Sequence, residues 1–223
     1  MNELSQAEIE RLQKMSLSEQ RLKKEGFTRI AGVDEAGRGP LAGPVVAVAC
    51  ILPEETYFEN LNDSKQLTPE QREELYSQII ACPDLMYGIG IMDVETIDSV
   101  NILQATFLAM RAAIESLEDQ PDYALIDGSQ IPLLEFPTEF VVGGDAKSIS
   151  IAVASILAKV TRDRIMIEND AKYPQYGFKS NKGYATDFHM KAIYKFGPCL
   201  IHRKTFDPVK SILNPQPVQE SLL

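Results

Sequence analysis

Two adjacent carboxylates, Asp34 and Glu35, lie where an apolar segment runs into a glycine-rich loop. Two acids side by side at the edge of a core repel each other unless a cation lies between them, and a divalent metal ion is the simplest such cation. Two further acids hold comparable places, since Asp127 ends a short apolar segment and Asp145 precedes a long Ala-rich helical pattern. Four converging carboxylates can hold two Mg²⁺ ions about 4 Å apart, the arrangement used for in-line displacement at a phosphodiester.

Each acid also has a simpler interpretation. Asp145 could be an acid at a helix N-terminus, Asp127 a turn residue, and the Asp34-Glu35 pair a solvated strand end. Neighbouring residues on a regular strand point to opposite faces, so Asp34 and Glu35 can share a site only if the strand ends there and Glu35 turns with the loop. Any metal is expected to be Mg²⁺ or Mn²⁺ on carboxylate oxygens, because the chain has only two histidines and three scattered cysteines.

The segment Gly37-Arg38-Gly39 that follows has three interpretations. It weakly suggests a dinucleotide-binding turn, but the glycine spacing is wrong and the neighbouring acids would repel a pyrophosphate. It could be a plain turn. As a substrate loop, its glycines would let backbone polar groups approach a ribose closely, and Arg38 would supply charge for a phosphate.

The elements that must position these residues follow from hydrophobic periodicity and turn residues. A chain of 223 residues is expected to form one large domain. Strands followed by alternating strands and helices predict an α/β protein with a mixed sheet, whose site assembles beyond the strand ends. The predicted strands cover residues 28–34, 45–52, 85–92, 121–127 and 140–145, and the predicted helices cover 1–25, 68–82, 98–117, 148–170 and 186–196.

The distribution of charge and of apolar residues limits the kinds of partner that the protein can have. The formal charge is -10, but residues 159–210 carry 11 basic and 5 acidic side chains, a net +6 that could hold a phosphate backbone or be an ordinary solvated surface. No apolar stretch of 18 residues and no signal-peptide core is present, so we expect a cytoplasmic protein without a membrane partner.

The signature of the bacterial ribonuclease HII family (type 2 ribonuclease H) closely resembles one stretch of this chain, Asp34-Glu-Ala-Gly-Arg-Gly-Pro-Leu-Ala-Gly-Pro-Val-Val46. Other segments resemble the family in the same order along the chain, from about residue 28 to residue 212. They are Asp63-Ser-Lys65, Val100-Asn-Ile-Leu-Gln-Ala-Thr106, Ile126-Asp-Gly128, Ala154-Ser-Ile-Leu-Ala-Lys-Val-Thr-Arg-Asp163, Lys182-Gly-Tyr184 with Thr186 and His189, and His202-Arg-Lys204 before Phe206.

This resemblance implies a ribonuclease H-like mixed sheet flanked by helices, with a C-terminal helical region. It implies an endonuclease that cuts the RNA strand of RNA–DNA hybrids and single ribonucleotides embedded in duplex DNA, leaving a 3′-hydroxyl and a 5′-phosphate, with a role in DNA repair and replication. Two Mg²⁺ or Mn²⁺ ions are expected with substrate bound. The metal-binding and catalytic acids of the family fall on Asp34, Glu35, Asp127 and Asp145.

Substrate recognition is implied in the same way. The Gly-Arg-Gly loop of the family falls on Gly37, Arg38 and Gly39, which would sense the 2′-hydroxyl on the 5′ side of the cut. Its tyrosine falls on Tyr184, which would stack on the deoxyribose beyond the cut, although a tyrosine can also be an ordinary half-buried aromatic. The family usually has a histidine where this chain has Asn181, so a phosphate contact made by that histidine would be weakened.

The two histidines of the chain, His189 and His202, are expected to be structural or phosphate-facing rather than metal ligands. Two other functions stay open: a non-catalytic nucleic-acid-binding module of the same fold, and a Rossmann-type nucleotide-binding enzyme, which would need a proper GxGxxG.

The domain organisation expected from the sequence is a helical extension (1–27), a catalytic domain that includes the C-terminal helical region (28–213) and a flexible tail (214–223). We expect a monomer. The tail ends in Gln219-Glu-Ser-Leu-Leu223, which resembles the short peptide by which replication enzymes dock on the sliding clamp.

Overall fold

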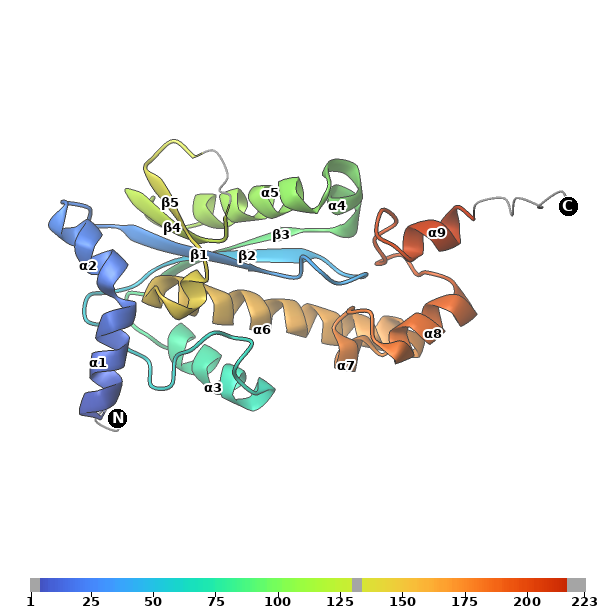
Figure 1. The fold of residues 1–223 in the computed structure, drawn as a ribbon, viewed down its shortest axis with the longest axis horizontal. Coiled ribbons are helices and arrows are strands. Elements are labelled where there is room, and N and C mark those ends of the chain that lie inside the picture. The colour runs from blue at the N-terminus through green and yellow to red at the C-terminus, as the bar shows by residue number, and fades with distance from the viewer. Residues whose placement is uncertain (1–4, 130–133, 216–223) are drawn as a thin grey trace, which may run out of the picture.

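A five-stranded mixed sheet forms the centre of the molecule in the computed structural model, which describes residues 5–129 and 134–215 (Figure 1). The spatial order of the strands is β3-β2-β1-β4-β5. β1 pairs antiparallel with β2 and parallel with β4, β2 pairs antiparallel with β3, and β4 pairs parallel with β5. The strands are β1 (Ile30–Ala36), β2 (Val45–Ile51), β3 (Met86–Met92), β4 (Tyr123–Asp127) and β5 (Thr138–Val141).

Helices cover both faces of this sheet. α4 (Val94–Val100) and α5 (Ile102–Glu115) lie on one face, against β2 and β3, while α3 (Pro69–Ile80) and α6 (Ile149–Lys172) lie on the other (Figure 1). α6 approaches β1 so closely that a Cβ added at Gly32 would lie 2.2 Å from the backbone carbon of Ser150. Only a residue without a side chain permits this packing, which fixes the start of α6 beside β1.

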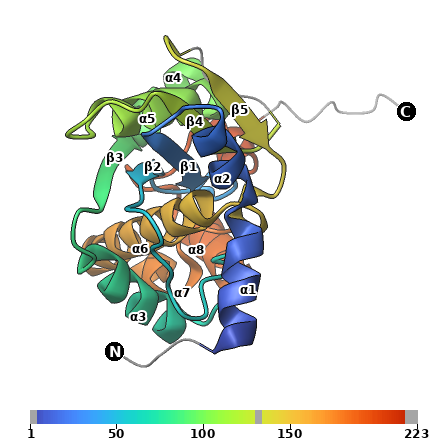
Figure 2. The same cartoon turned by 90° about the vertical axis from the view of Figure 1, so that its left-hand side faces the viewer.

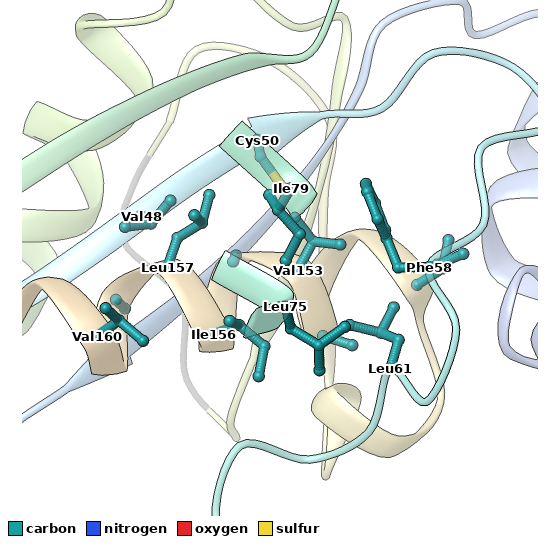
Figure 3. Close-up of a cluster of buried hydrophobic side chains, with 14 of the residues drawn as sticks. Val48, Cys50, Phe58, Leu61, Leu75, Ile79, Val153, Ile156, Leu157 and Val160 are labelled. Carbon is teal, nitrogen blue, oxygen red and sulfur yellow. The ribbon is translucent and has the colours of Figure 1, made fainter. Parts of the chain in front are cut away.

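The core between α6, α3 and β2 is apolar (Figure 3). Val48 and Cys50 of β2 pack against α6, and α3 adds Leu75 and Ile79 to the same cluster. A second core lies on the opposite face, between the sheet and α5. Because both faces of β2 are covered, all of its residues are buried, as an apolar run without alternation predicts. Cys50, Cys82 and Cys199 are all free.

Two predicted helices are divided. Residues 1–25 were expected to form one helix, but the structure has α1 (Gln6–Met15) and α2 (Leu17–Lys24), broken at Ser16. The helix expected over 98–117 is broken at Asn101, whose φ of 69° is incompatible with a continuous helix and whose side chain instead caps α5. Figure 2 shows α1 and α2 beside the start of α6.

A C-terminal helical region lies at the far end of α6 from α1 and α2 (Figure 1). Its elements are η2 (Pro174–Tyr176), α7 (Phe178–Asn181), α8 (Asp187–Phe196) and α9 (Val209–Leu213), which share a separate apolar cluster with the end of α6. The predicted α/β class, mixed sheet and C-terminal helical region are confirmed. None of the helices within residues 5–129 and 134–215 combines the length and apolar character needed to cross a bilayer.

The capping box that starts α3 allows a stability prediction. The Thr68 hydroxyl accepts a hydrogen bond from the Gln71 N–H, and the Gln71 side chain accepts one from the Thr68 N–H. We expect Thr68→Ala to lower the free energy of unfolding by about 1 kcal/mol, because it leaves a helix N–H unsatisfied. Urea denaturation measures this change. Ser77→Ala on the same helix is the control, since the Ser77 hydroxyl donates only to the Glu73 carbonyl; an equal loss there would contradict the prediction.

Candidate active site

Asp34 and Glu35 extend from the same strand in opposite directions. The strand was expected to end at Asp34, but β1 continues to Ala36, and Glu35 lies opposite Ala47 of β2 in the regular register. The expectation that Glu35 turns with the loop is therefore wrong, because backbone pairing with β2 keeps it in the strand. Asp34 lies beside Ser155 of α6, whereas Glu35 lines a pocket on the α5 face of the sheet.

Asp127 interacts electrostatically with both of these acids. It ends β4, which runs parallel to β1, so both strands bring their carboxylates to the same edge of the sheet. Its Oδ1 accepts a hydrogen bond from the Gly144 N–H at 2.6 Å. The negative charge of Asp127 raises the pKa values of Asp34, Glu35 and Asp145, although burial is the larger cause for each.

Asp145 reaches this group from a short 3₁₀ turn. The strand predicted over 140–145 ends at Val141, and Asp145 lies in η1 (Gly144–Ala146), just before α6. The Gly143-Gly144 pair breaks the strand, since Gly143 has a left-handed backbone with φ 65°. Asp145 is buried, and its Oδ2 lies 3.4 Å from the Lys65 Nζ.

Burial and mutual repulsion together oppose ionisation of the acids at the site, and burial is the larger cause. Burial raises the pKa of Asp34 well above its ordinary value, and the charges of Glu35 and Asp127 raise it further. Burial likewise raises the pKa of Asp145, against which Lys65 acts. Burial opposes the charge of Lys65 itself, but Asp145, Asp63 and Asp34 outweigh it and raise its pKa. Such a cluster stores unfavourable energy that a bound cation would relieve.

The donor set fits a hard divalent cation, since every candidate ligand is a carboxylate oxygen. Among residues 5–129 and 134–215, however, no three acidic, histidine or cysteine side chains lie close enough to hold one ion. Two of the acids already have local partners. Asp34 Oδ1 accepts a hydrogen bond from the Glu35 N–H at 2.7 Å, and the Lys65 Nζ donates one to Asp145. Ligation of one ion by three of these residues therefore requires them to move closer together.

The glycine-rich loop is held in place by a buried arginine. The Arg203 guanidinium is fully buried, and its Nη1 donates to the Arg38 carbonyl at 2.8 Å. Its other nitrogens donate to the carbonyls of Gly37, Gly43 and Pro44. Burial, aided by the nearby charge of Arg162, lowers the pKa of Arg203 to about 9, so the cation persists at neutral pH. The Arg203 guanidinium therefore holds the loop through the loop's carbonyl groups and makes no hydrogen bond to the loop's N–H groups.

Arg162 of α6 provides a second support. Its Nε donates to the Pro44 carbonyl at 2.9 Å, and its Nη2 donates to the Ala42 carbonyl at 3.0 Å. Its Nη1 donates to the Lys182 carbonyl at 3.0 Å, which ties the loop to the segment before Tyr184. Gly37, with φ 101°, has room for no Cβ, because such an atom would lie 2.0 Å from the Arg162 Nε.

Tyr184 lies next to the glycine-rich loop. A Cβ added at Gly39 would lie 3.8 Å from the Tyr184 ring, and the tyrosine is 45% exposed. The Leu41 N–H donates to the Gly183 carbonyl at 2.8 Å, so the two segments are also joined through their backbones. This exposure distinguishes Tyr184 from an ordinary core aromatic.

Asn181 and the two histidines point inward. The Asn181 Oδ1 accepts from the Gly183 N–H at 2.8 Å, and its Nδ2 donates to the Tyr176 carbonyl at 2.7 Å. Asn181 is buried and therefore shapes the turn that carries Tyr184. His189 and His202 are also buried, so of the two roles expected for them the structural one holds.

A pocket of about 190 Å³ opens beside the acids. Glu35, Arg38 and Asp127 line it together with the α5 residues Leu103, Thr106 and Phe107. It brings a candidate metal ligand, the loop arginine and the end of β4 to one concave surface.

The family model for ribonuclease HII matches residues 31–209, which is most of the chain. The chain belongs to the ribonuclease HII family. It is thus an enzyme of the ribonuclease H class. The curated ribonuclease HII of Chlamydia trachomatis serovar A is 51% identical over 195 residues, covering 87% of this chain and 89% of that protein.

Two other relatives agree with this family. The ribonuclease HII of Caldanaerobacter subterraneus subsp. tengcongensis is 52% identical over 199 residues, covering 89% of this chain and 82% of that protein. The crystal structure of the ribonuclease H2 from Pyrococcus horikoshii OT3 matches with a TM-score of 0.69 and 30% identity, covering 83% of this chain and 97% of that one.

Three residues that organise the site of this ribonuclease HII family member were given no role from its sequence: Lys65, Arg162 and Arg203. Each lies inside a segment that resembles the family, and Arg162 stands out as a charge on the apolar part of a helical pattern. A charge at a buried position of that helix was the available signal. Its partners are backbone carbonyls far along the chain, which periodicity does not identify.

Proposed function

We propose that this ribonuclease HII family member is an endoribonuclease that hydrolyses the RNA strand of RNA–DNA hybrids and cuts at single ribonucleotides embedded in duplex DNA. The observation that supports the proposal is the electrostatic coupling of Asp127 to Asp34, Glu35 and Asp145, beside the glycine-rich loop. The products would be a 3′-hydroxyl and a 5′-phosphate, which suits ribonucleotide removal in DNA repair and replication.

The four acids would hold Mg²⁺ or Mn²⁺, with two ions present when substrate is bound. When bound, these ions supply Lewis-acid activation of the attacking water and stabilise charge on the leaving 3′-oxygen. Lys65 balances the charge of Asp145 before the ions arrive. The hydrogen bonds to Asp34 and Asp127 orient these two carboxylates.

Gly37, Arg38 and Gly39 would recognise the ribose on the 5′ side of the cut. A 2′-hydroxyl is the local difference between RNA and DNA, and backbone polar groups of a glycine loop can pair with it at short range. Arg203 and Arg162 prepare the loop by occupying its carbonyls from the inside. The exposed ring of Tyr184, next to Gly39, would stack on the deoxyribose beyond the cut.

We further propose that the enzyme works as a cytoplasmic monomer, with a helical extension (1–27) on a catalytic domain (28–213); the tail expected over 214–223 lies almost wholly outside the described residues. The proposed clamp-docking peptide, Gln219–Leu223, lies outside the described residues. Binding to a sliding clamp that survives deletion of residues 219–223 would reject this role for the peptide.

Cleavage of a DNA duplex with one embedded ribonucleotide tests the enzymatic proposal. We expect a cut at that position with Mg²⁺ or Mn²⁺, none with EDTA, and none in the matching all-DNA duplex. Analysis of the product ends should find the 3′-hydroxyl and 5′-phosphate. Binding of the duplex without any cut would instead indicate a non-catalytic module, and indifference to EDTA would reject the metal-dependent mechanism.

A further inference from the structure

A chain of hydrogen bonds runs through the C-terminal helical region to the backbone of Tyr184. The Cys199 N–H donates to the His202 Nδ1 at 2.9 Å. The Nε2 atoms of His202 and His189 lie 3.0 Å apart, and the His189 Nδ1 lies 2.8 Å from the Tyr184 carbonyl oxygen. Residues from three separate segments thus meet in one continuous path.

The groups at the two ends of the path determine which atom donates in each of its hydrogen bonds. A carbonyl oxygen can only accept, so the His189 Nδ1 must carry a proton, and a backbone N–H can only donate, so the His202 Nδ1 must offer its lone pair. Neutral His202 therefore carries its proton on Nε2 and donates it to the unprotonated Nε2 of His189. Each ring has one tautomer, and each tautomer depends on the other.

The surroundings keep both rings neutral. His189 and His202 are 0% and 1% exposed, and the rings of Tyr176 and Phe178 pack against them. Burial lowers the pKa of His189, and burial together with the repulsion that a protonated His189 would exert lowers the pKa of His202 to about 4. The thiol of Cys199, 3.1 Å from the His202 Nδ1, is held in its neutral form because burial raises its pKa.

The end of the path supports a side chain that is otherwise exposed. Within its own turn, Tyr184 donates its N–H to the Asn181 carbonyl at 2.9 Å and accepts from the Thr186 N–H at 2.8 Å. His189 adds a further link from this turn to the rest of the helical region, through the second lone pair of the Tyr184 carbonyl. The ring itself projects toward solvent beside Gly39.

We propose that His202 and His189 form a positioning relay for Tyr184, which holds the tyrosine ring at the distance from the glycine-rich loop that an RNA-to-DNA junction requires. This inference rests on the function proposed above. The relay touches neither substrate nor metal. Its effect should therefore be on the choice between substrates: it should favour a single embedded ribonucleotide, where Tyr184 matters most, over a long hybrid.

Substituting each histidine by Asn or by Gln removes one hydrogen bond of the relay at a time. Asn places its amide nitrogen where the histidine Nδ1 lies, and Gln places its amide where Nε2 lies. His189→Asn keeps a donor for the Tyr184 carbonyl, whereas His189→Gln loses it and keeps a partner for His202. His202→Gln keeps a donor for His189, whereas His202→Asn keeps only the acceptor for Cys199.

The measurement is kcat/KM on a single-ribonucleotide duplex and on a long RNA–DNA hybrid, taken as a ratio. We expect His189→Gln and His202→Asn to lower this ratio by about tenfold, a typical effect of losing one stacking contact. His189→Asn and His202→Gln should stay near the wild-type ratio. In the background of Tyr184→Ala, His189→Gln should have no further effect on the ratio, because it acts through that ring.

Equal losses on both substrates for all four variants, in parallel with their thermal stability, would show a merely structural pair and overturn the proposal. Crystal structures of His189→Gln and His189→Asn provide a readout that needs no activity. We expect Tyr184 to move away from Gly39 only in His189→Gln, and an unmoved ring there would also overturn the relay. Failure of the wild type to cut the single-ribonucleotide duplex would count against the proposed function alone.

Discussion

Asp34→Asn is expected to lower cleavage of RNA–DNA hybrids by about a thousandfold or more while the fold stays intact. The substitution removes one carboxylate from the acidic cluster and keeps the shape of the side chain. Cleavage assays in Mg²⁺ and in Mn²⁺ measure the loss, and circular dichroism checks the fold. Full activity in the variant, or loss of folding, would count against the metal-binding role of Asp34.

The same variant should be more stable than the wild type in EDTA, by about 1 kcal/mol. The pKa of Asp34 is raised, chiefly by burial, so its ionised form destabilises the folded state. This advantage should be largest at neutral pH and vanish as the pH falls below the ordinary value of 3.8, where the wild-type carboxyl is protonated in both states. Mg²⁺ should raise the Tm of the wild type more than that of the variant.

Asp122→Asn is the matched control. Burial opposes the charge of Asp122, but hydrogen bonds from Thr28 and Arg29 outweigh it and lower its pKa. Its carboxylate therefore stabilises the fold, so the control should be less stable than the wild type at neutral pH and should cleave at the normal rate. If both variants shift stability in the same direction, the raised pKa of Asp34 is not the cause.

Tyr184→Ala should lower kcat/KM for a single embedded ribonucleotide by about ten- to a hundredfold, and that for a long hybrid much less. The expected loss corresponds to one stacking contact, worth about 1–3 kcal/mol. Tyr184 is 45% exposed, so its truncation leaves no cavity and thermal stability should change little. Parallel cleavage assays on the two substrates measure the difference.

Tyr87→Ala on β3 is the control for this variant, since Tyr87 is similarly exposed at 40% but lies on the edge strand of the sheet. It should leave the ratio of the two substrates unchanged. Equal losses on both substrates in Tyr184→Ala would remove the junction role and reduce Tyr184 to a general contact with the duplex.

The N-terminal helices also contribute to the site, through Glu19. The Oε1 of this buried residue accepts hydrogen bonds from the hydroxyls of Ser148 and Ser150 and from the Ser150 N–H. These serines start α6, which directly follows the turn that holds Asp145. A carboxylate at a helix N-terminus is favourable. The extension therefore fixes the helix start beside a candidate metal ligand.

Local features of the sequence were enough to predict most of the helices and strands and to identify the candidate acids. The apolar run of β2, the Thr68-Pro69 start of α3 and the Gly197 stop of α8 each depend on residues adjacent in sequence. Local signals were insufficient at Asp34, where pairing with β2 carries the strand past the expected end. They were also insufficient at Asn101, whose backbone divides a periodic pattern that reads as one helix.

Only the tertiary structure decided which groups meet. Lys65 reaches Asp145 across 80 positions, and Arg203 reaches the Arg38 carbonyl across 165, so no local pattern could reveal either contact. The opposite directions of Asp34 and Glu35 likewise follow from strand pairing. The types of donors and acids are local properties of the sequence, whereas their distances, burial and pKa shifts arise when the sheet and α6 bring distant segments together.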